Sequence, residues 1–197
     1  MLRQFKLGLT LAGLAIVGAL TFGVATKNSN GILNNSRSVV SADVPVGNAA
    51  IQVGSNKILT QVGQTISVPV TLELGQERAV GLDLFINYDP TYLTLVDADT
   101  AKEGIQIKTS SPFGLEVVNS VNPAIGQINY SSVMAAGSSP VSGTQVVATL
   151  EFKAELAGQT NILPKFKLGS TTDTNVANAN GRDLLSRASG IAIVINQ

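Results

Sequence analysis

The sequence of 197 residues contains no cysteine, no histidine and no tryptophan. Without cysteine there can be no disulfide bond and no thiolate nucleophile, so the fold depends on its hydrophobic core. Without histidine, Ser-His-Asp and Cys-His catalytic arrangements, most zinc sites and histidine pH switches are excluded. Lys and Arg together number 13, as do Asp and Glu, and the formal net charge is 0. This balance, with no basic cluster, argues against nucleic acid as a partner.

The first 25 residues have the pattern of an export signal. Arg3 and Lys6 precede a nearly uncharged apolar run over residues 7–25, as in the n-region and h-region of a signal peptide. Small residues in Gly23-Val24-Ala25 fit cleavage by signal peptidase after Ala25. The run is close to the ~20 residues that span a bilayer, which leaves an uncleaved membrane anchor as the alternative. Either outcome predicts an extracellular protein, secreted or held at the cell surface.

Residues 26–48 are predicted to be a flexible linker. The segment is rich in Asn and Ser, shows no stable period and contains the turn signal Asn30-Gly31. From about Ala49 the sequence changes to alternating apolar and polar runs, so residues 49–197 are predicted to form one folded domain. A domain of about 150 residues buries roughly 68–70% of the surface of its unfolded chain, which is enough to fold without disulfides.

The pattern of residues 49–197 predicts an all-β fold. The clearest strands cover residues 65–74, with Pro69 on the outward side, and residues 145–155, with Val146 on the inward side. Because proline lacks a backbone N–H, Pro69 should lie at a sheet edge or where no neighbour needs a donor. Eight or nine short strands, separated by loops rich in Gly, Pro, Ser and Asn, indicate an antiparallel β-sandwich of about nine strands, with a jelly-roll or immunoglobulin-like path.

Residues 80–96, VGLDLFINYDPTYLTLV, form the most informative stretch. Apolar residues at alternate positions predict a strand with one face against the core. The alternation ends at Asp89-Pro90, because proline has no ladder donor and restricts the residue before it. On the outward side Phe85 stands between Asp83 and Asn87, which is either a solvated sheet face or a contact surface for a partner. The predicted inward positions are Leu82, Leu84, Ile86 and Tyr88.

Several motifs follow one another in a set order along residues 49–196. The most specific is the strand that ends in Tyr88-Asp89-Pro90 with Leu93 three residues later. The others are Val62-Gly63-Gln64-Thr65 leading into SVPVTLEL, Gly126-Gln127-Ile128-Asn129-Tyr130, residues 147–154 (VATLEFKA), and Ser189-Gly190-Ile191-Ala192-Ile193 after a polar loop at residues 173–183. In content and order they resemble the cohesin domain, the receptor module of bacterial scaffolding proteins, whose strand closes in Y-D-P-x-x-L.

The resemblance to the cohesin domain implies a nine-stranded jelly-roll sandwich and a non-catalytic role in binding another protein. In that family the partner, a small helical dockerin, lies against a sheet face that includes the outward side of the Y-D-P strand. Asp83 stands where the family often carries a polar contact residue. The resemblance therefore implies that Asp83 and Asn87 face a protein partner such as a dockerin-like module, and Phe85 between them would supply apolar contact area.

Two groups of oxygen-bearing side chains are candidates for calcium ligands. Asp97 and Asp99 lie close together with no further acids near them in sequence, which favours turn residues over metal ligands. The loop of residues 173–183 is rich in Asp and Asn, but Ala177 and Ala179 occupy positions where EF-hand spacing needs oxygen. Side chains that cap turns are favoured at both places, so we predict no metal and no other cofactor.

Three other functions are alternatives to protein binding. A glycosidase needs a pair of carboxylates, but the acidic residues are scattered over loops and outward positions, so no enzyme is predicted. Binding of a polysaccharide would suit a β-sandwich, although the chain has no tryptophan for stacking and both Tyr88 and Tyr130 have inward parity. Self-association is the third alternative, for instance by pairing of residues 44–53 with the sheet edge of a neighbouring copy.

Overall fold

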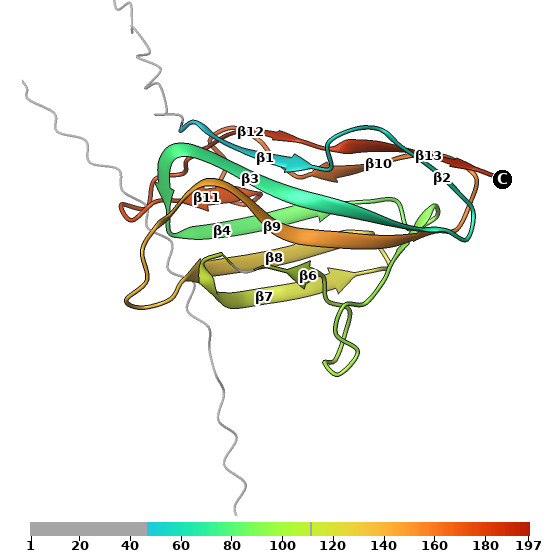
Figure 1. Cartoon of the computed structure of the whole chain (residues 1–197), viewed down its shortest axis with the longest axis horizontal. Coiled ribbons are helices and arrows are strands. Elements are labelled where there is room, and N and C mark those ends of the chain that lie inside the picture. Colours follow the sequence, from blue (N-terminus) through green and yellow to red (C-terminus); the bar gives the residue numbers. More distant parts are fainter. Residues whose placement is uncertain (1–46, 111) are drawn as a thin grey trace, which may run out of the picture. The chain divides into compact units, whose positions relative to one another are not determined.

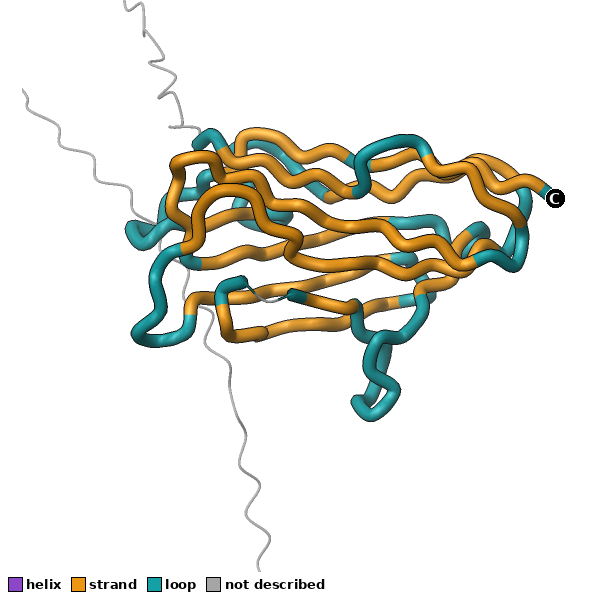
Figure 2. The backbone as a smooth tube through the Cα atoms, viewed as in Figure 1, coloured by secondary structure: helices purple, strands orange, loops and turns teal. Residues whose placement is uncertain are grey.

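A computed structural model describes residues 47–110 and 112–197 of the chain. These residues form strands joined by loops and turns (Figure 2), and among them no helix has the length and hydrophobicity needed to cross a membrane. The predicted signal or anchor at residues 1–25 lies outside the described residues, as do residues 26–46 of the predicted linker. The strands are β1 (Ala49–Val53), β2 (Ile58–Gln61), β3 (Thr65–Ala79), β4 (Gly81–Asn87), β5 (Leu93–Leu95), β6 (Lys108–Thr109), β7 (Gly114–Asn122), β8 (Gln127–Met134), β9 (Val141–Ala154), β10 (Gly158–Pro164), β11 (Asn175–Ala177), β12 (Leu185–Ser189) and β13 (Ile191–Asn196).

The strands form two sheets that face each other across one core (Figure 1). One sheet has the order β12-β1-β3-β9-β5, with β6 also paired to β9; the other has the order β2-β13-β10-β4-β8-β7, with β11 also paired to β4. The predicted all-β sandwich is therefore confirmed. The described residues contain 13 strands instead of about nine. The excess arises because β5, β6 and β11 are only two or three residues long and leave little pattern in the sequence.

One hydrophobic core fills the space between the two sheets. Strand β3 runs through the middle of its sheet and alternates between buried and exposed side chains over its first ten residues. Burying an aliphatic side chain of this size contributes roughly 1.5–3 kcal/mol, so this strand is a major source of stability. Its predicted inward positions, Ile66, Val68, Val70, Leu72 and Leu74, are all buried.

Pro69 lies in an interior strand, because β3 pairs with both β1 and β9. Its carbonyl oxygen accepts a hydrogen bond of 2.7 Å from the N–H of Gly54, the residue that follows β1. The nitrogen and carbonyl of one residue in an antiparallel strand point to the same side, so the Pro69 nitrogen faces the region beyond the end of β1. The prediction that Pro69 lies at a sheet edge is wrong. The alternative prediction is confirmed, because no neighbouring strand needs a backbone donor at this position.

Strand β9 contains a bulge that its sequence does not reveal. Val146, predicted to point inward, is 48% exposed, while the adjacent Val147 is fully buried. The register against β3 shifts between Val70 and Thr71, whose partners are Ala148 and Val146. One extra residue in a strand reverses the alternation beyond it. The predicted inward position of Val146 is therefore wrong.

Two strand pairs are parallel, β1 with β12 and β2 with β13, where the sequence predicted an antiparallel arrangement. The chain passes from one sheet to the other between β1 and β2, and again at Gly190 between β12 and β13. A Cβ atom at Gly190 would overlap the carbonyl oxygen of Ile162, so this crossing requires glycine. The last two strands, β12 and β13, thus pair in parallel with the first two, β1 and β2, in opposite sheets.

Candidate docking surface

Strand β4 carries the predicted contact residues and lies between β8 on one side and β10 and β11 on the other. Its inward side chains are buried, as predicted, while Asp83 and Asn87 are exposed and Phe85 between them is half-buried. Successive side chains of a strand point to opposite faces, so these three residues share the outward side. The structure therefore places all three predicted site residues on one face of one sheet.

The turn after β4 is held from two directions. Asp89 Oδ1 accepts a hydrogen bond of 2.9 Å from the Thr91 N–H, and the Asp89 carbonyl accepts one of 3.1 Å from the Leu93 N–H. Behind the turn, Gly126 has a φ of 64°, and a Cβ atom there would overlap the carbonyl oxygen of Tyr88. A positive φ favours glycine, and here the space also requires it. These contacts fix the end of β4 and the register of its outward residues.

Asp83 lies at one end of the outward row, next to Ser131 on β8 and Asn175 on β11. The Ser131 hydroxyl donates a hydrogen bond of 2.5 Å to Asp83 Oδ1. Hydrogen bonds to a carboxylate are shorter and stronger than those between neutral groups. The carboxylate is consequently held in one orientation while it remains exposed, which suits it to accept hydrogen bonds from a partner.

Phe85 is not the isolated exposed aromatic residue that its sequence context suggested. The segment after β10 runs beside it: the Lys165 N–H donates to the Phe85 carbonyl at 2.7 Å, and the Phe85 N–H donates to Thr174 Oγ1 at 3.1 Å. Lys165 Nζ lies 6.0 Å from the centroid of the Phe85 ring, at the limit of a weak cation–π attraction. A partner on this face would meet the ring together with the ammonium group of Lys165.

Asn87 ends the outward row on β4. It pairs with Gln127 on β8 and with Leu163 on β10. Leu163 is 51% exposed, so the amide of Asn87 has an apolar neighbour on one side and a second amide on the other. This end of the row offers hydrogen-bonding groups without formal charge.

An apolar patch at the β7 edge of this face was missed from the sequence. It consists of Leu115 and Val118 on β7 and Val133 on β8, which are 38–52% exposed, and Leu115 pairs directly with Val133. The register of β7 shifts between Glu116 and Val118, which breaks the alternation that would have assigned faces to its residues. In the sequence, residues 127–134 alternate between apolar and polar positions, and Val133 stands at an outward position among Asn129 and Ser131.

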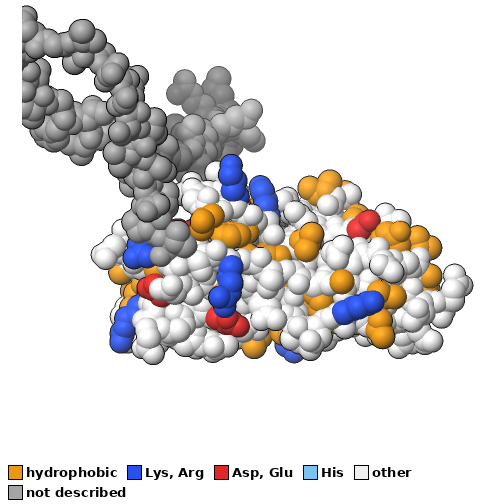
Figure 3. All heavy atoms as spheres, turned by 90° about the horizontal axis from the view of Figure 1, so that it is seen from above, with side chains coloured by type: hydrophobic (Ala, Val, Ile, Leu, Met, Phe, Trp, Pro, Cys, Tyr) orange, Lys and Arg blue, Asp and Glu red, His pale blue; other side chains and the backbone are white. Residues whose placement is uncertain are grey.

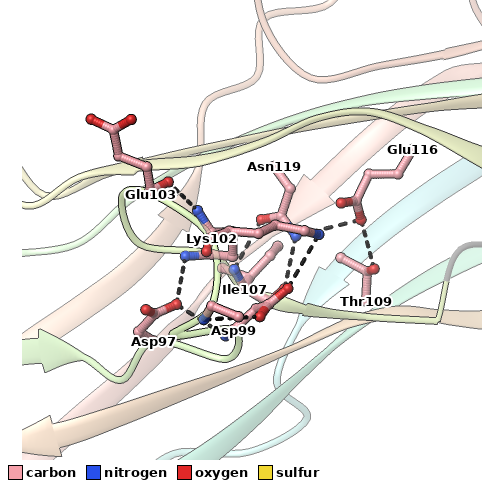
Figure 4. Close-up of polar contacts among 10 residues, drawn as sticks. Asp97, Asp99, Lys102, Glu103, Ile107, Thr109, Glu116 and Asn119 are labelled. Carbon is pink, nitrogen blue, oxygen red and sulfur yellow. Dashed lines mark hydrogen bonds and ion pairs between the residues drawn. The ribbon is translucent and has the colours of Figure 1, made fainter.

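The oxygen-rich segments weighed as calcium sites are engaged in turns. Asp97 Oδ1 accepts hydrogen bonds from the N–H groups of Asp99 (3.1 Å) and Gln106 (3.0 Å), and Asp99 Oδ2 forms an ion pair with Lys102 at 3.3 Å (Figure 4). In the later loop, Asp183 Oδ1 accepts two backbone N–H groups at 3.0 Å. No three acidic side chains of residues 47–110 and 112–197 are grouped so that they could hold a metal ion.

Charge is sparse on the surface of this domain. On the face seen in Figure 3, charged side chains are few and hydrophobic side chains lie in small separate patches. On the outward face of β4, the nearby charges described above are those of Asp83 and Lys165. Contacts made here would therefore depend on apolar area, shape and hydrogen bonds more than on long-range attraction.

Known structures share this fold. A type II cohesin of the cellulosome of Acetivibrio cellulolyticus is 17% identical with a TM-score of 0.60, and the match covers 74% of this chain and 94% of that one. CaCohA2 from Clostridium acetobutylicum is 19% identical with a TM-score of 0.56, covering 75% and 91%. Coh-OlpC from Clostridium thermocellum, solved with Doc435, is 11% identical with a TM-score of 0.58, covering 75% and 93%. No curated protein matches the sequence.

The match to a protein family extends over most of the folded residues. The family described as Cohesin domain matches residues 49–187, which is well over half of the chain and includes β4, its Tyr88-Asp89-Pro90 turn and the β7 apolar patch. Cohesin domains are non-catalytic modules that bind other proteins, as the resemblance implied. The chain belongs to the cohesin family.

Proposed function

We propose that this chain binds a dockerin-like module on the outward face of β10, β4, β8 and β7. Solved relatives include cohesins in complex with dockerins, among them CaCohA2 with a variant of CaDoc0917 and Coh-OlpC with Doc435. The observation that carries the proposal here is the exposed, hydrogen-bonded carboxylate of Asp83 on the same face as the β7 apolar patch. At protein interfaces buried apolar area supplies most of the free energy, and polar groups set the register.

The register of the sheet makes the carboxylate and the apolar patch neighbours. Asp83 on β4 pairs with Ser131 on β8, and Ser131 pairs with Val118 on β7. One row across three strands thus runs from a carboxylate through a hydroxyl to an exposed valine. Asn87 lies two outward positions from Asp83 along β4, so it adds a second polar group beside this row. A partner helix laid across this row could bury Val118 while its donors reach Asp83.

The test is isothermal titration calorimetry between residues 47–197 and dockerin-like modules encoded in the same genome. We expect one of these modules to bind, and we expect Asp83→Ala and Val118→Ala each to weaken binding about tenfold or more. Val146→Ala is the matched control for Val118→Ala, because Val146 is also an exposed valine (48% against 38%) but belongs to the other sheet. The proposal fails if no module binds, or if the control weakens binding as much as the two variants on this face.

We also propose that residues 1–25 direct export and that residues 26–48 tether the domain outside the cell. The charged start and apolar run of residues 1–25 support the signal, and cohesins are typically parts of extracellular scaffoldins. Amino-terminal sequencing of the exported protein should find Thr26 as the first residue if the signal is cleaved. Protein that stays in the cytoplasm would contradict the proposal, whereas an intact amino terminus in the membrane fraction would identify an anchor.

We infer that docking requires no metal held by this chain. The carboxylates of Asp97 and Asp183 already accept backbone N–H groups, and such turns form without an ion. The melting temperature of the domain should therefore not change between millimolar calcium and excess EDTA. A higher melting temperature in calcium would contradict this, since a ligand that binds only the folded state stabilises it.

A further inference from the structure

A hollow lies where the sheet separates between β4 and β10. Strand β10 pairs with β13 along Gly158–Ile162, but it meets β4 only at Leu163 and Pro164. Before these residues β10 has no paired contact with β4, and a hollow of about 470 Å³ occupies the space between β10 and the Tyr88-Asp89-Pro90 turn. The hollow is shallow and widely open to solvent.

Two largely buried residues that line the hollow, Thr160 and Tyr88, carry hydroxyl groups. Thr160 is 7% exposed and Tyr88 is 5% exposed. Neither side-chain hydroxyl forms a hydrogen bond with any residue that the structure describes. Burial raises the pKa of Tyr88, so its hydroxyl stays neutral and can both donate and accept. Neither hydroxyl oxygen belongs to the fully buried side-chain atoms without a partner, so both keep some contact with solvent and are available to donate to and accept from a polar ligand.

The rim of the hollow adds more neutral hydrogen-bonding groups. Asn87, Gln159 and Asn161 are exposed and carry amides, each with donors and an acceptor. Leu163 and Pro90 provide apolar surface on the same rim. Among the lining residues the charged group is Asp89, and its Oδ1 already accepts the Thr91 N–H. The hollow therefore combines hydroxyls, amides and a small apolar surface with little charge.

We propose that this hollow binds a neutral, hydroxyl-rich ligand, a sugar residue of an oligosaccharide or polysaccharide. Ring hydroxyls of a sugar both donate and accept hydrogen bonds, which matches the amides and the two unpaired hydroxyls. The C–H face of the ring would lie against Leu163 and Pro90. An extended peptide would present fewer hydroxyl groups to these partners, and the test below includes it as the alternative ligand.

The sugar site overlaps the proposed docking surface at Asn87 and Leu163. The variants that test it are therefore placed elsewhere on β10, at the outward residue Asn161 and the inward residue Thr160. Thr160→Val replaces the hydroxyl by a methyl group of nearly the same size, and Asn161→Ala removes a rim amide. Thr149→Val, on a half-buried threonine of the opposite sheet, is the matched control. Circular dichroism and thermal melting would verify that each variant is folded.

The probes are neutral oligosaccharides of β-1,4-glucan, β-1,4-mannan, β-1,4-xylan and α-1,4-glucan, titrated into ¹⁵N-labelled full-length chain or its exported form. We expect one probe to shift the amide signals of residues 87–90 and 159–163, with an affinity that Thr160→Val and Asn161→Ala each lower about tenfold. Thr149→Val should leave it unchanged. The proposal is overturned if no probe shifts these signals at millimolar concentration, if the two variants bind as the parent does, or if an unrelated extended peptide produces the same shifts.

Discussion

The hydroxyl of Ser131 on β8 donates a 2.5 Å hydrogen bond to Asp83 Oδ1 on β4. The two residues face each other across the strand pair, so the bond spans neighbouring strands on the outward side of the sheet. The ion pairs Lys102–Asp99, Lys153–Glu155 and Arg187–Glu73 do not include this carboxylate. The arrangement gives the proposed docking surface a negative charge that is fixed in orientation.

Ser131→Ala should weaken dockerin-like binding while leaving the fold intact. The substitution frees the Asp83 carboxylate to rotate, and the loss of one such hydrogen bond costs about 1 kcal/mol, or roughly fivefold in Kd. Calorimetric titration measures the affinity, and Ser131→Thr, which keeps the hydroxyl, should restore most of it. Equal affinity of Ser131→Ala and the parent chain would show that the orientation of Asp83 does not matter for binding.

Gly126→Ala should destabilise the domain by more than about 2 kcal/mol. Its φ of 64° costs an alanine about 1 kcal/mol, and the added methyl group must also displace the carbonyl of Tyr88. Gly137→Ala is the control, because Gly137 has a φ of 83° but open space around it. Chemical denaturation measures both. Similar losses for the two variants would mean that backbone conformation alone explains the effect.

The bulge in β9 predicts opposite outcomes for two adjacent valines. Val147→Asp places an unpaired charge in the core and should cost several kcal/mol or prevent folding. Val146→Asp places the same charge on the surface and should change the free energy of unfolding by about 0.5 kcal/mol or less. Urea denaturation followed by circular dichroism distinguishes them. If Val146→Asp were the more damaging variant, the register of β9 would have to be reassigned.

The stability of the domain should fall at alkaline pH through Tyr88. Burial raises the pKa of Tyr88 in the folded state, so the unfolded chain, with a tyrosine pKa of about 10, loses this proton first. The contribution is fully present below pH 10 and is lost as the pH rises toward the folded pKa. Tyr88→Phe cannot titrate, so the stability of the parent chain should fall more steeply than that of the variant above pH 10. Parallel slopes in urea denaturation would contradict the prediction.

The fold class and the position of the candidate face could be predicted from the sequence. Alternation in residues 66–74 and 82–88 assigned the inward side chains correctly, because a strand has a period of two and its side chains are sorted by burial. The Tyr88-Asp89-Pro90 turn marked the end of β4, since the restriction that proline imposes is local. The order of such local motifs was enough to indicate the cohesin family.

Only the tertiary structure decided what lies beside each strand. Periodicity states which side of a strand faces the core, but pairing across long separations determines its neighbours. For this reason the sequence could not show Lys165 next to Phe85, the bulge that turns Val146 outward, or the apolar patch around Val118. The hollow lined by Thr160 likewise exists because β10 and β4 pair over two residues and then separate. The sequence by itself thus determined the sandwich and its outward strand, whereas long-range pairing determined the surfaces on which partners and ligands can bind.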